Sequence, residues 1–547
     1  MNTPEYRKKI LFIDDSYVLQ VDNLRRTTNQ AVKHPTPVLN IDAPWNTNKD
    51  EFNGLNVLYD PHNKLFTMWY GVSRRWGADW GGADDLTAYA TSTDGIHWER
   101  PILNMVEHNG SRENNFITAS ELENFGPSII LDPNAVPTRR FKMIFTASNV
   151  YGSMRVTDWA RHHVTLNLAS SEDGVHWDRP TFVNPVLRGI SDGVFSLFYD
   201  VDRNKYQLYT RRVPNLPRDI SLYESFDLVN WEDCGRVLVA GDNQDPPTLY
   251  NIHGMSVLRY DTYILGLANM MYLHPRSEEL GVFQAPPDDY PDKDRIGLLD
   301  MQLAFSTDGR NWRRAHDRSP VVPVGQANAP DRGTIYPQTN PPNVVNGDTY
   351  IYFSAHSSRH TAWSRKMVDA SVHHDLRKTG CAMLAIMHED HWVSFDAGPK
   401  EGSLLAGPWR HLPHRFFINA DSRDGSIEVE FVDAYERPLP GLSRADCIPI
   451  TADGKNQEVK WKGDPHPDQV EGDYRGGVMA RIYVKNAKLY SCTLAQPDPD
   501  GTIRRYWANY QWNINIFHQR DQWDRDNNRP AGGVPPVTRG IPNYREY

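Results

Sequence analysis

A seven-residue motif, Ser-x-Asp-x-x-x-Trp, occurs four times and constrains the fold of this chain more than any other feature. In three copies Gly follows the Asp. Asp-Gly between two extended runs is typical of a tight hairpin turn, because Gly accepts the positive φ that such turns require. The copies span residues 92–98, 171–177, 225–231 and 306–312. One turn that recurs at long intervals indicates a repeat architecture, in which each copy closes a unit of about four short strands, the blade of a β-propeller.

Between the turns, short runs rich in Val, Ile, Tyr and Phe alternate with Gly, Asn, Asp and Pro, which is typical of an all-β chain. The first unit has such runs at 54–60 and 64–70, and the same order recurs along the chain. A fifth unit, with runs at 349–354 and 382–386, lacks the motif. No segment has a sustained helical period of apolar residues. We therefore predict a five-bladed β-propeller over residues 1–397.

The pattern changes after the propeller. Runs that alternate apolar and polar residues, with turns between them, extend over 398–497 and predict an antiparallel β-sandwich. Residues 498–547 are rich in Trp, Tyr, Asn, Arg and Pro and are too polar for a core of their own. We expect this C-terminal extension to cover a neighbouring surface, and it is our candidate contact for a homo-oligomer.

Composition and charge limit the classes of partner. A net charge of −10 argues against a nucleic-acid partner. No apolar stretch is long enough for a membrane span, and residues 1–14 lack the apolar region of a signal peptide, so we expect a cytoplasmic protein. The four cysteines (Cys234, Cys381, Cys447 and Cys492) lie far apart and are expected to be free thiols.

A propeller with Asp-Gly-x-x-Trp turns followed by a β-sandwich resembles the five-bladed glycoside hydrolases, among them fructofuranosidases, arabinanases, xylosidases and anhydro-galactosidases. The resemblance implies a site at the mouth of the central channel, built from the first residues of the innermost strands. It also implies that carboxylates entering the first, third and fourth blades act as nucleophile or base, transition-state stabiliser and acid.

Two of these carboxylate positions are filled. Residues 50–55, Asp-Glu-Phe-Asn-Gly-Leu, resemble the fructofuranosidase motif Asn-Asp-Pro-Asn-Gly-Leu. Aligning Asn-Gly-Leu places Glu51 at the nucleophile position, with Asp50 beside it. In the third blade, Asp192 precedes its strand as the stabilising Asp does in the family.

The acid position departs from the family, because His253 stands where the resemblance predicts Glu. Glycoside hydrolysis commonly uses two carboxyl groups, one of them protonated. An imidazole is able to replace the acid, since its ordinary pKa lies near neutrality. Asp242 or Asp245, on the preceding loop, is the alternative acid. His253 in a channel mouth is also able to act only as a hydrogen-bond partner of a sugar hydroxyl.

Further polar and aromatic residues lie near strand ends at the same face and suit a polyhydroxylated ligand. The candidate substrate-binding residues are Trp45, Asn46, Arg74, Trp76, Asn124, Arg212, Asp245, Arg332, Tyr336 and His356. No cluster of His, Cys, Asp and Glu has metal-ligand spacing, so we predict neither a metal nor another cofactor. Asp94, Asp173, Asp227 and Asp308 are expected to cap their turns.

These features predict a glycoside hydrolase that releases a terminal sugar from a small oligosaccharide or glycoside, with furanosides among its candidate substrates. A glycoside phosphorylase is an alternative, with Arg74, Arg75 and Arg332 as the phosphate pocket. A non-catalytic carbohydrate-binding propeller is another, since a blade pattern does not prove catalysis. Sialidases fit less well, because their turn motif is one residue longer, they have six blades, and their arginine triad is not found here.

Overall fold

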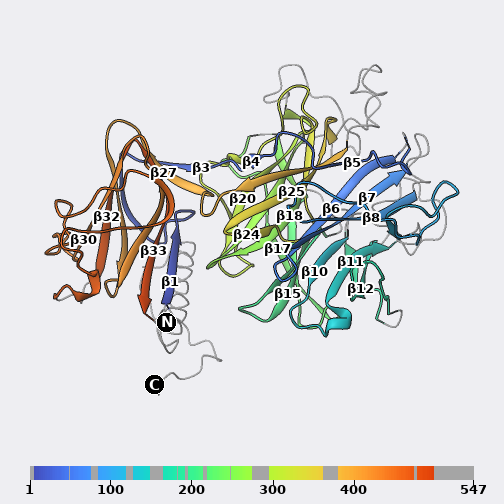
Figure 1. Cartoon of the computed structure of the whole chain (residues 1–547), viewed down its shortest axis with the longest axis horizontal. Coiled ribbons are helices and arrows are strands. Elements are labelled where there is room, and N and C mark those ends of the chain that lie inside the picture. Colours follow the sequence, from blue (N-terminus) through green and yellow to red (C-terminus); the bar gives the residue numbers. More distant parts are fainter. Residues whose placement is uncertain are drawn as a thin grey trace.

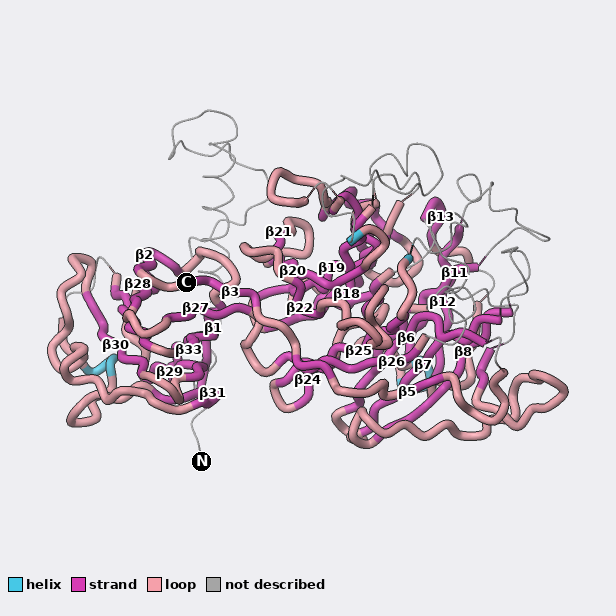
Figure 2. The backbone as a smooth tube through the Cα atoms, turned by 90° about the horizontal axis from the view of Figure 1, so that it is seen from above, coloured by secondary structure: helices cyan, strands magenta, loops and turns pink. Residues whose placement is uncertain are grey.

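The computed structural model describes residues 5–47, 50–74, 84–118, 127–147, 164–180, 183–190, 195–212, 218–246, 248–273, 295–360, 380–472 and 477–497. Within these ranges the chain is all-β, as predicted, with short 3₁₀ turns such as η2 (Pro137–Arg139) and η7 (Pro467–Gln469) and no α-helix. Figure 1 shows two lobes side by side along the long axis of the molecule. Figure 2 shows the same two lobes from above, joined by extended segments.

The propeller begins with three four-stranded antiparallel sheets, each formed by consecutive strands. The first blade consists of β6 (Asp50–Asp60), β7 (Leu65–Arg74), β8 (Asp84–Ser92) and β9 (Phe116–Thr118). The second consists of β10 (Ser128–Leu131), β11 (Phe141–Ala147), β12 (Val164–Ser171) and β13 (Leu187–Ile190). The third consists of β14 (Ser196–Asp200), β15 (Lys205–Thr210), β16 (Ile220–Ser225) and β17 (Trp231–Leu238).

The next two blades share one eleven-stranded sheet, because Leu299 and Thr334 pair in parallel at a single point. The fourth blade consists of β18 (Leu249–Tyr260), β19 (Tyr263–Tyr272) and β20 (Leu299–Ser306), with β21 (Arg313–Arg314) and β22 (Pro320–Val322) on its outer edge. The fifth consists of β23 (Thr334–Pro337), β24 (Asn343–Val345), β25 (Asp348–His356) and β26 (Cys381–Met387). Two N-terminal strands, β4 (Val32–Lys33) and β5 (Leu39–Asn40), complete its outer edge.

A belt of five fully buried polar side chains joins the innermost strands of successive blades: Asn56, Ser128, Ser196, Ser256 and Asn340. Asn56, Ser128 and Ser196 each accept a hydrogen bond from a backbone N–H of the next blade, at 3.0, 2.9 and 3.3 Å. Ser256 donates to the carbonyl of Asn340 at 2.9 Å, and Asn340 Oδ1 accepts from Val57 of the first blade at 3.1 Å. Burial would be costly without these partners. The belt returns to its starting blade, which supports the predicted count of five.

The four repeated motifs form hairpin turns at equivalent places, between the third and fourth strands of the first four blades. In every copy the Ser Oγ donates to the Asp carboxylate at 2.9–3.0 Å. The same carboxylate oxygen accepts two backbone N–H groups of the turn at 2.7–2.9 Å. These bonds stabilise the ionised form, and they lower the pKa of Asp227 to about 2 against the opposing effect of burial. The predicted capping role of these Asp residues therefore has a direct structural basis.

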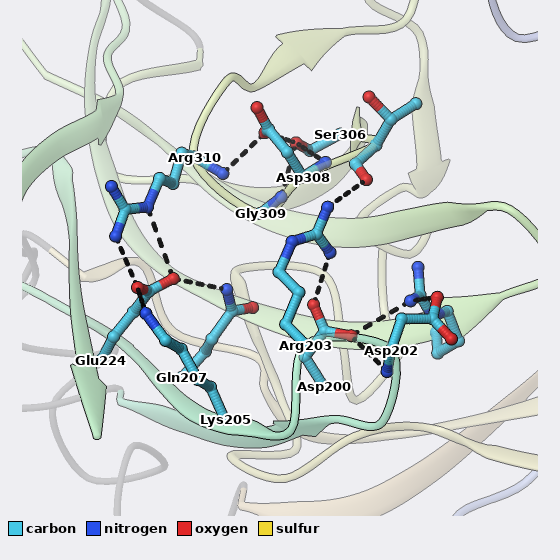
Figure 3. Close-up of polar contacts among 12 residues, drawn as sticks. Asp200, Asp202, Arg203, Lys205, Gln207, Glu224, Ser306, Asp308, Gly309 and Arg310 are labelled. Carbon is cyan, nitrogen blue, oxygen red and sulfur yellow. Dashed lines mark hydrogen bonds and ion pairs between the residues drawn. The ribbon is translucent and has the colours of Figure 1, made fainter. Parts of the chain in front are cut away.

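Three of the turns also contact the neighbouring blade through an aromatic side chain. Trp69 of β7 donates to Gly174 O at 2.7 Å, Tyr209 of β15 donates to Gly309 O at 3.0 Å, and Tyr352 of β25 donates to Gly95 O at 2.8 Å. Figure 3 shows two further links on this side, where Arg203 joins Asp200 to the fourth-blade turn and Arg310 of that turn binds Glu224. We call this side of the propeller the turn face.

The second lobe is a sandwich of two antiparallel sheets around an apolar core that includes Trp409, Phe431 and Trp461. One sheet contains β1 (Glu5–Leu11), β3 (Arg25–Thr28), β27 (Val393–Ala397), β29 (Arg415–Asp421), β31 (Asp453–Glu458) and β33 (Ala487–Pro497). The other contains β2 (Val18–Asp22), β28 (Gly402–Trp409), β30 (Ser426–Val432) and β32 (Val478–Lys485). The predicted β-sandwich is thus present.

The predicted boundary at residue 397 needs a correction at the N-terminus. Residues 1–397 were assigned to the propeller, whereas β1 pairs with β33, β2 with β28 and β3 with β27. These pairings complete sandwich sheets that the C-terminal strands alone would leave with open edges. The predicted extension over 498–547 lies outside the described residues.

The sandwich contacts the turn face of the propeller through β1. Lys9 forms ion pairs with Glu389 and Asp390 at 3.0 and 2.8 Å. Lys8, which is 3% exposed, donates to Tyr17 OH at 2.6 Å. Burial lowers the pKa of Lys8 to about 7, although Asp261 of the β18–β19 hairpin opposes this. This junction therefore contains an amine that titrates near neutrality.

Three of the free thiols, Cys381, Cys447 and Cys492, are buried, and Cys234 is half-buried. In the part of the chain that the structure describes, no helix is long and apolar enough to cross a membrane.

Candidate functional site

The face opposite the turns is where the innermost strands begin, and we call it the mouth. His253 lies three residues before the belt residue Ser256, and Tyr336 lies four residues before Asn340. A strand rises about 3.3 Å per residue, so both lie roughly 10–13 Å from the belt toward the mouth. Residues far apart in sequence therefore meet at one end of the channel.

Four side chains gather there, and we call them the mouth cluster: His253, Tyr336, His356 and His360. The ring of Tyr336 lies 5.1 Å from that of His253 and 5.8 Å from that of His356, measured between centroids. Its hydroxyl is 2.9 Å from His360 Nδ1. His253 and His360 are 5.1 Å apart, centroid to centroid. Tyr336, His356 and His360 are half-buried and His253 is buried, so the cluster brings one phenol and three imidazoles together.

The position of His356 depends on a glycine beside it. A Cβ on Gly380 would lie 2.9 Å from Phe52 Cβ and 3.1 Å from His356 Cε1. The absence of a side chain thus lets the segment that leads into β26 pass between β6 and His356. This contact joins the start of the first blade to the mouth cluster.

The environment of His253 bears on its predicted role as general acid. The ring is 9% exposed, and its Nδ1 has no hydrogen-bond partner among the described residues. Burial holds the pKa of His253 well below its usual value, and the nearby positive charges of Arg211, His360 and Arg218 lower it further. The ring is therefore uncharged at neutral pH, which suits a hydrogen-bond partner better than a proton donor.

Asp50 is buried at the start of β6, and its carboxylate binds residues of the loop that precedes this strand. Its carboxylate accepts a hydrogen bond from Thr47 N at 2.8 Å and lies 3.7 Å from His108 Nε2. Asn46 donates to the same oxygen at 3.5 Å. A carboxylate held in this way caps a loop, and so Asp50 has a structural explanation that needs no substrate.

Glu51 lies in β6, and Arg74 ends β7, but their side chains lie outside the described part of the structure. Asp192, Trp76 and Asn124 lie outside the described residues altogether. The catalytic roles of Glu51 and Asp192 stay predictions.

Three other predicted residues bind elsewhere in the fold, whereas a fourth, Arg332, contacts the residue that follows His356 of the mouth cluster. Trp45 donates to Asn115 Oδ1 at 3.0 Å beside the core of the first blade. Arg212 pairs with Asp233 of the outer strand β17 at 3.1 Å. Asp245 binds Arg314 and Arg318, on the outer side of the fourth blade. Arg332 is exposed and donates to Ser357 O at 3.3 Å.

The two alternative acids, Asp242 and Asp245, belong to one ion-pair group with Arg314 and Arg318. Asp242 pairs with Arg318 at 2.8 Å, which lowers the pKa of Asp242 despite burial. Burial raises the pKa of Asp245 although two arginines contact it. Both carboxylates thus bind arginines of β21 and of the loop that follows it.

Three further charged residues near the site, Arg211, Arg218 and Asp300, are not among those that the sequence predicts. Arg211 is 1% exposed, and with Arg218 it forms the charged surroundings of His253. Burial raises the pKa of Asp300 to about 6, against hydrogen bonds from Tyr272 and Arg295 at 3.0 and 3.2 Å. The sequence feature that could have pointed to Asp300 is its position as a carboxylate inside an apolar run, residues 298–301. Asp300 lies on β20, two strands out from His253.

A second polar group lies on the turn face and does not fit a metal. Glu224, Glu232 and Cys234 could place three ligand atoms within 4.8 Å of one another. Glu224, however, already binds Lys205, Gln207 and Arg310, at 3.0, 3.0 and 2.5 Å, as Figure 3 shows. These bonds lower its pKa to about 2 in spite of burial. A groove of about 270 Å³ beside it is lined by Phe226 and Trp231, on the side away from the mouth.

No family model matches the chain, and no curated protein matches it. Among solved structures, a glycosyl hydrolase from Bacteroides ovatus is similar over 66% of this chain and 94% of its own, with 14% identity and a TM-score of 0.40. A structure from a study of mannoside phosphorylases and glycoside hydrolases that target β-1,2-mannosidic linkages in Candida mannan has 14% identity, the same coverage and a TM-score of 0.41. An N-acetylgalactosamine deacetylase from F. plautii covers 67% of this chain and 94% of its own, with 13% identity and a TM-score of 0.38. The fold and the site above rest on the strand pairing and contacts of this chain alone.

Proposed function

We propose that this protein is a glycoside hydrolase that acts at the mouth of the propeller and releases a terminal sugar from a small oligosaccharide or glycoside. The observation that carries the proposal is the mouth cluster, in which a half-buried Tyr336 lies 5.1 Å from His253 and has its hydroxyl 2.9 Å from His360. Aromatic and imidazole rings with convergent hydrogen-bonding groups suit a polyhydroxylated ligand. The resemblance of residues 50–55 to a fructofuranosidase motif supports the same class.

Each group has a distinct chemical task in this proposal. Glu51 serves as nucleophile or base and Asp192 stabilises positive charge at the anomeric carbon, as the resemblance implies. His253, which its surroundings keep uncharged, binds a sugar hydroxyl through a ring nitrogen. The ring of Tyr336 offers an apolar face to the sugar ring.

The direct test is a turnover screen of the purified full-length protein on aryl glycofuranosides and glycopyranosides. We expect one sugar series to be hydrolysed, with turnover independent of inorganic phosphate. A protein that binds sugars without turning over any member of the panel would instead be the carbohydrate-binding propeller, and the proposal would be wrong.

A glycoside phosphorylase is the second candidate, and one observation favours it. Arg211 and Arg218 lie close enough to His253 to lower its pKa, so positive charge gathers beside the mouth cluster. An anion such as phosphate is attracted to such a place. Turnover that requires inorganic phosphate and yields a sugar 1-phosphate would establish this candidate in place of the hydrolase.

A further inference from the structure

The mouth cluster contains a proton path that does not use His253. Tyr336 OH and His360 Nδ1 are 2.9 Å apart, within hydrogen-bonding distance. Tyr336 lies four residues from the belt on the innermost strand of the fifth blade, and it is half-buried. Tyr336 and His360 are both half-buried, so the hydrogen-bonded pair lies at the mouth end of the propeller without being sealed in its core.

The two imidazoles compete for one proton. His253 and His360 are 5.1 Å apart, and two positive charges at this distance repel each other. Burial and Arg211 keep His253 uncharged. A protonated His360 would donate its Nδ1–H to the oxygen of Tyr336, which lies 2.9 Å away.

We propose that Tyr336 is the catalytic acid of the glycosidase reaction and that His360 is the positioning residue that resupplies its proton. As the bond between the anomeric carbon and the glycosidic oxygen breaks, the phenolic proton moves to that oxygen. At the same time the Nδ1 proton of His360 moves to the oxygen of Tyr336. Tyr336 ends neutral, His360 becomes a neutral imidazole, and the leaving group departs as an alcohol. This inference rests on the proposed function.

The surroundings of the pair set its pH dependence. Among the described residues, the rings of His253 from β18 and His356 from β25 lie against Tyr336, and Arg211 and Arg218 lie near His253. Because the proposed acid must carry a proton, turnover on a substrate that needs protonation falls when rising pH removes that proton from the pair.

The test compares two glycosides of the same sugar, one with a poor leaving group such as phenol and one with dinitrophenol, which scarcely needs protonation. Tyr336→Phe removes only the hydroxyl and keeps the ring contacts, and His360→Asn removes the proton source. We expect both variants to lose about 10²- to 10⁴-fold in kcat/KM on the phenyl glycoside and less than about tenfold on the dinitrophenyl glycoside. The alkaline limb of the wild-type pH profile on the phenyl glycoside should disappear in both.

Two comparisons separate the proposal from its alternatives. Tyr435→Phe, in the sandwich and 80% exposed, is the matched control and should behave as wild type on both substrates. Equal losses on both glycosides in Tyr336→Phe would overturn the proposal and indicate a nucleophile or a binding group. A leaving-group-dependent loss in His253→Asn alone would return the acid role to His253. If the wild-type protein turns over no glycoside, the proposed function itself fails, and the proton path fails with it.

Discussion

On the turn face, each hairpin is held largely by hydrogen bonds within its own seven residues, and aromatic side chains then join it to the next blade. On the mouth face, the side chains that meet come from strands far apart in the sequence, and their rings contact one another at 5.1–5.8 Å. The turn Asp carboxylates are saturated by N–H groups, whereas His253 Nδ1 has no partner among the described residues. Satisfied polar groups stabilise a fold, whereas a buried polar atom without a partner costs it free energy.

Effects on stability and effects on turnover should therefore be separable between the two faces. A substitution on the turn face should change the free energy of unfolding with little effect on kcat. A substitution at the mouth should do the reverse, because groups kept for a substrate contribute little to folding and often reduce stability.

The adjacent carboxylates Asp50 and Glu51 of β6 allow a structural role and a catalytic role to be compared directly. Asp50 caps its loop through Thr47, whereas Glu51 is the predicted nucleophile or base. We expect Glu51→Gln to lower kcat by about 10²- to 10⁴-fold, equivalent to roughly 3–5 kcal/mol of barrier, with an unchanged urea midpoint. Asp50→Asn should lower the midpoint and cost less in kcat. The reverse result would place the chemistry on Asp50.

The turn face should show its largest effect at Gly174. Its φ is +78°, and a Cβ would lie 2.7 Å from Cζ2 of the fully buried Trp69. Gly174→Ala should therefore destabilise the protein by about 2–5 kcal/mol in urea unfolding, the sum of a left-handed backbone and an overpacked contact.

Gly110→Ala is the matched control for Gly174→Ala. Its φ is +80°, but nothing lies within 4 Å of the added Cβ, so we expect about 1–2 kcal/mol. Equal costs at the two glycines would mean that the contact between blades adds nothing. A fall in kcat in Gly174→Ala that exceeds the unfolded fraction would show that the two faces are coupled.

The sequence predicts those features of the fold whose interacting residues lie close together along the chain. The turns were predicted in place and type because Ser92, Asp94 and Gly95 bond with one another, so that the sequence contains the whole unit. The belt was not predicted, because Asn56 and Ser128 become partners of other blades only when the strands converge. The boundary at residue 397 missed β1, because the pairing of Glu5 with Pro497 joins the two ends of the described chain.

The site was predictable only in part, for the same reason. His253, Tyr336 and His356 were singled out by their positions near strand ends, and the structure brings them together. Strand position alone did not tell which way a side chain points, and so Trp45 and Arg212 were assigned to a pocket although each binds within its own blade. Neither the burial of Arg211 nor the uncharged state of His253 is visible before the blades are assembled.

The junction between the lobes should make the free energy of unfolding depend on pH through Lys8. The pKa of Lys8 is about 7 in the folded protein and near 10.5 when unfolded. The folded state thus binds fewer protons between these values, and the free energy of unfolding rises with pH from about 7 upward. Relative to Lys8→Met, the wild-type protein should gain about 2 kcal/mol between pH 7 and 9, measured by urea unfolding. Parallel curves for the two proteins would show that Lys8 is charged in the folded state throughout.

The smallest effect is expected for the loss of one hydrogen bond between blades, from Tyr352 to Gly95. Tyr352→Phe removes the hydroxyl that donates to Gly95 O at 2.8 Å and leaves the ring contacts with Phe66 and Trp98 in place. The carbonyl of Gly95 then loses a donor in a buried place, so we expect about 1 kcal/mol of destabilisation in urea unfolding and an unchanged kcat. Tyr350→Phe, on the same strand and half-buried, is the control and should lie within about 0.5 kcal/mol of wild type. If Tyr352→Phe lowers kcat and leaves the free energy of unfolding unchanged, the turn face influences turnover. The proposed separation of the two faces would then be wrong.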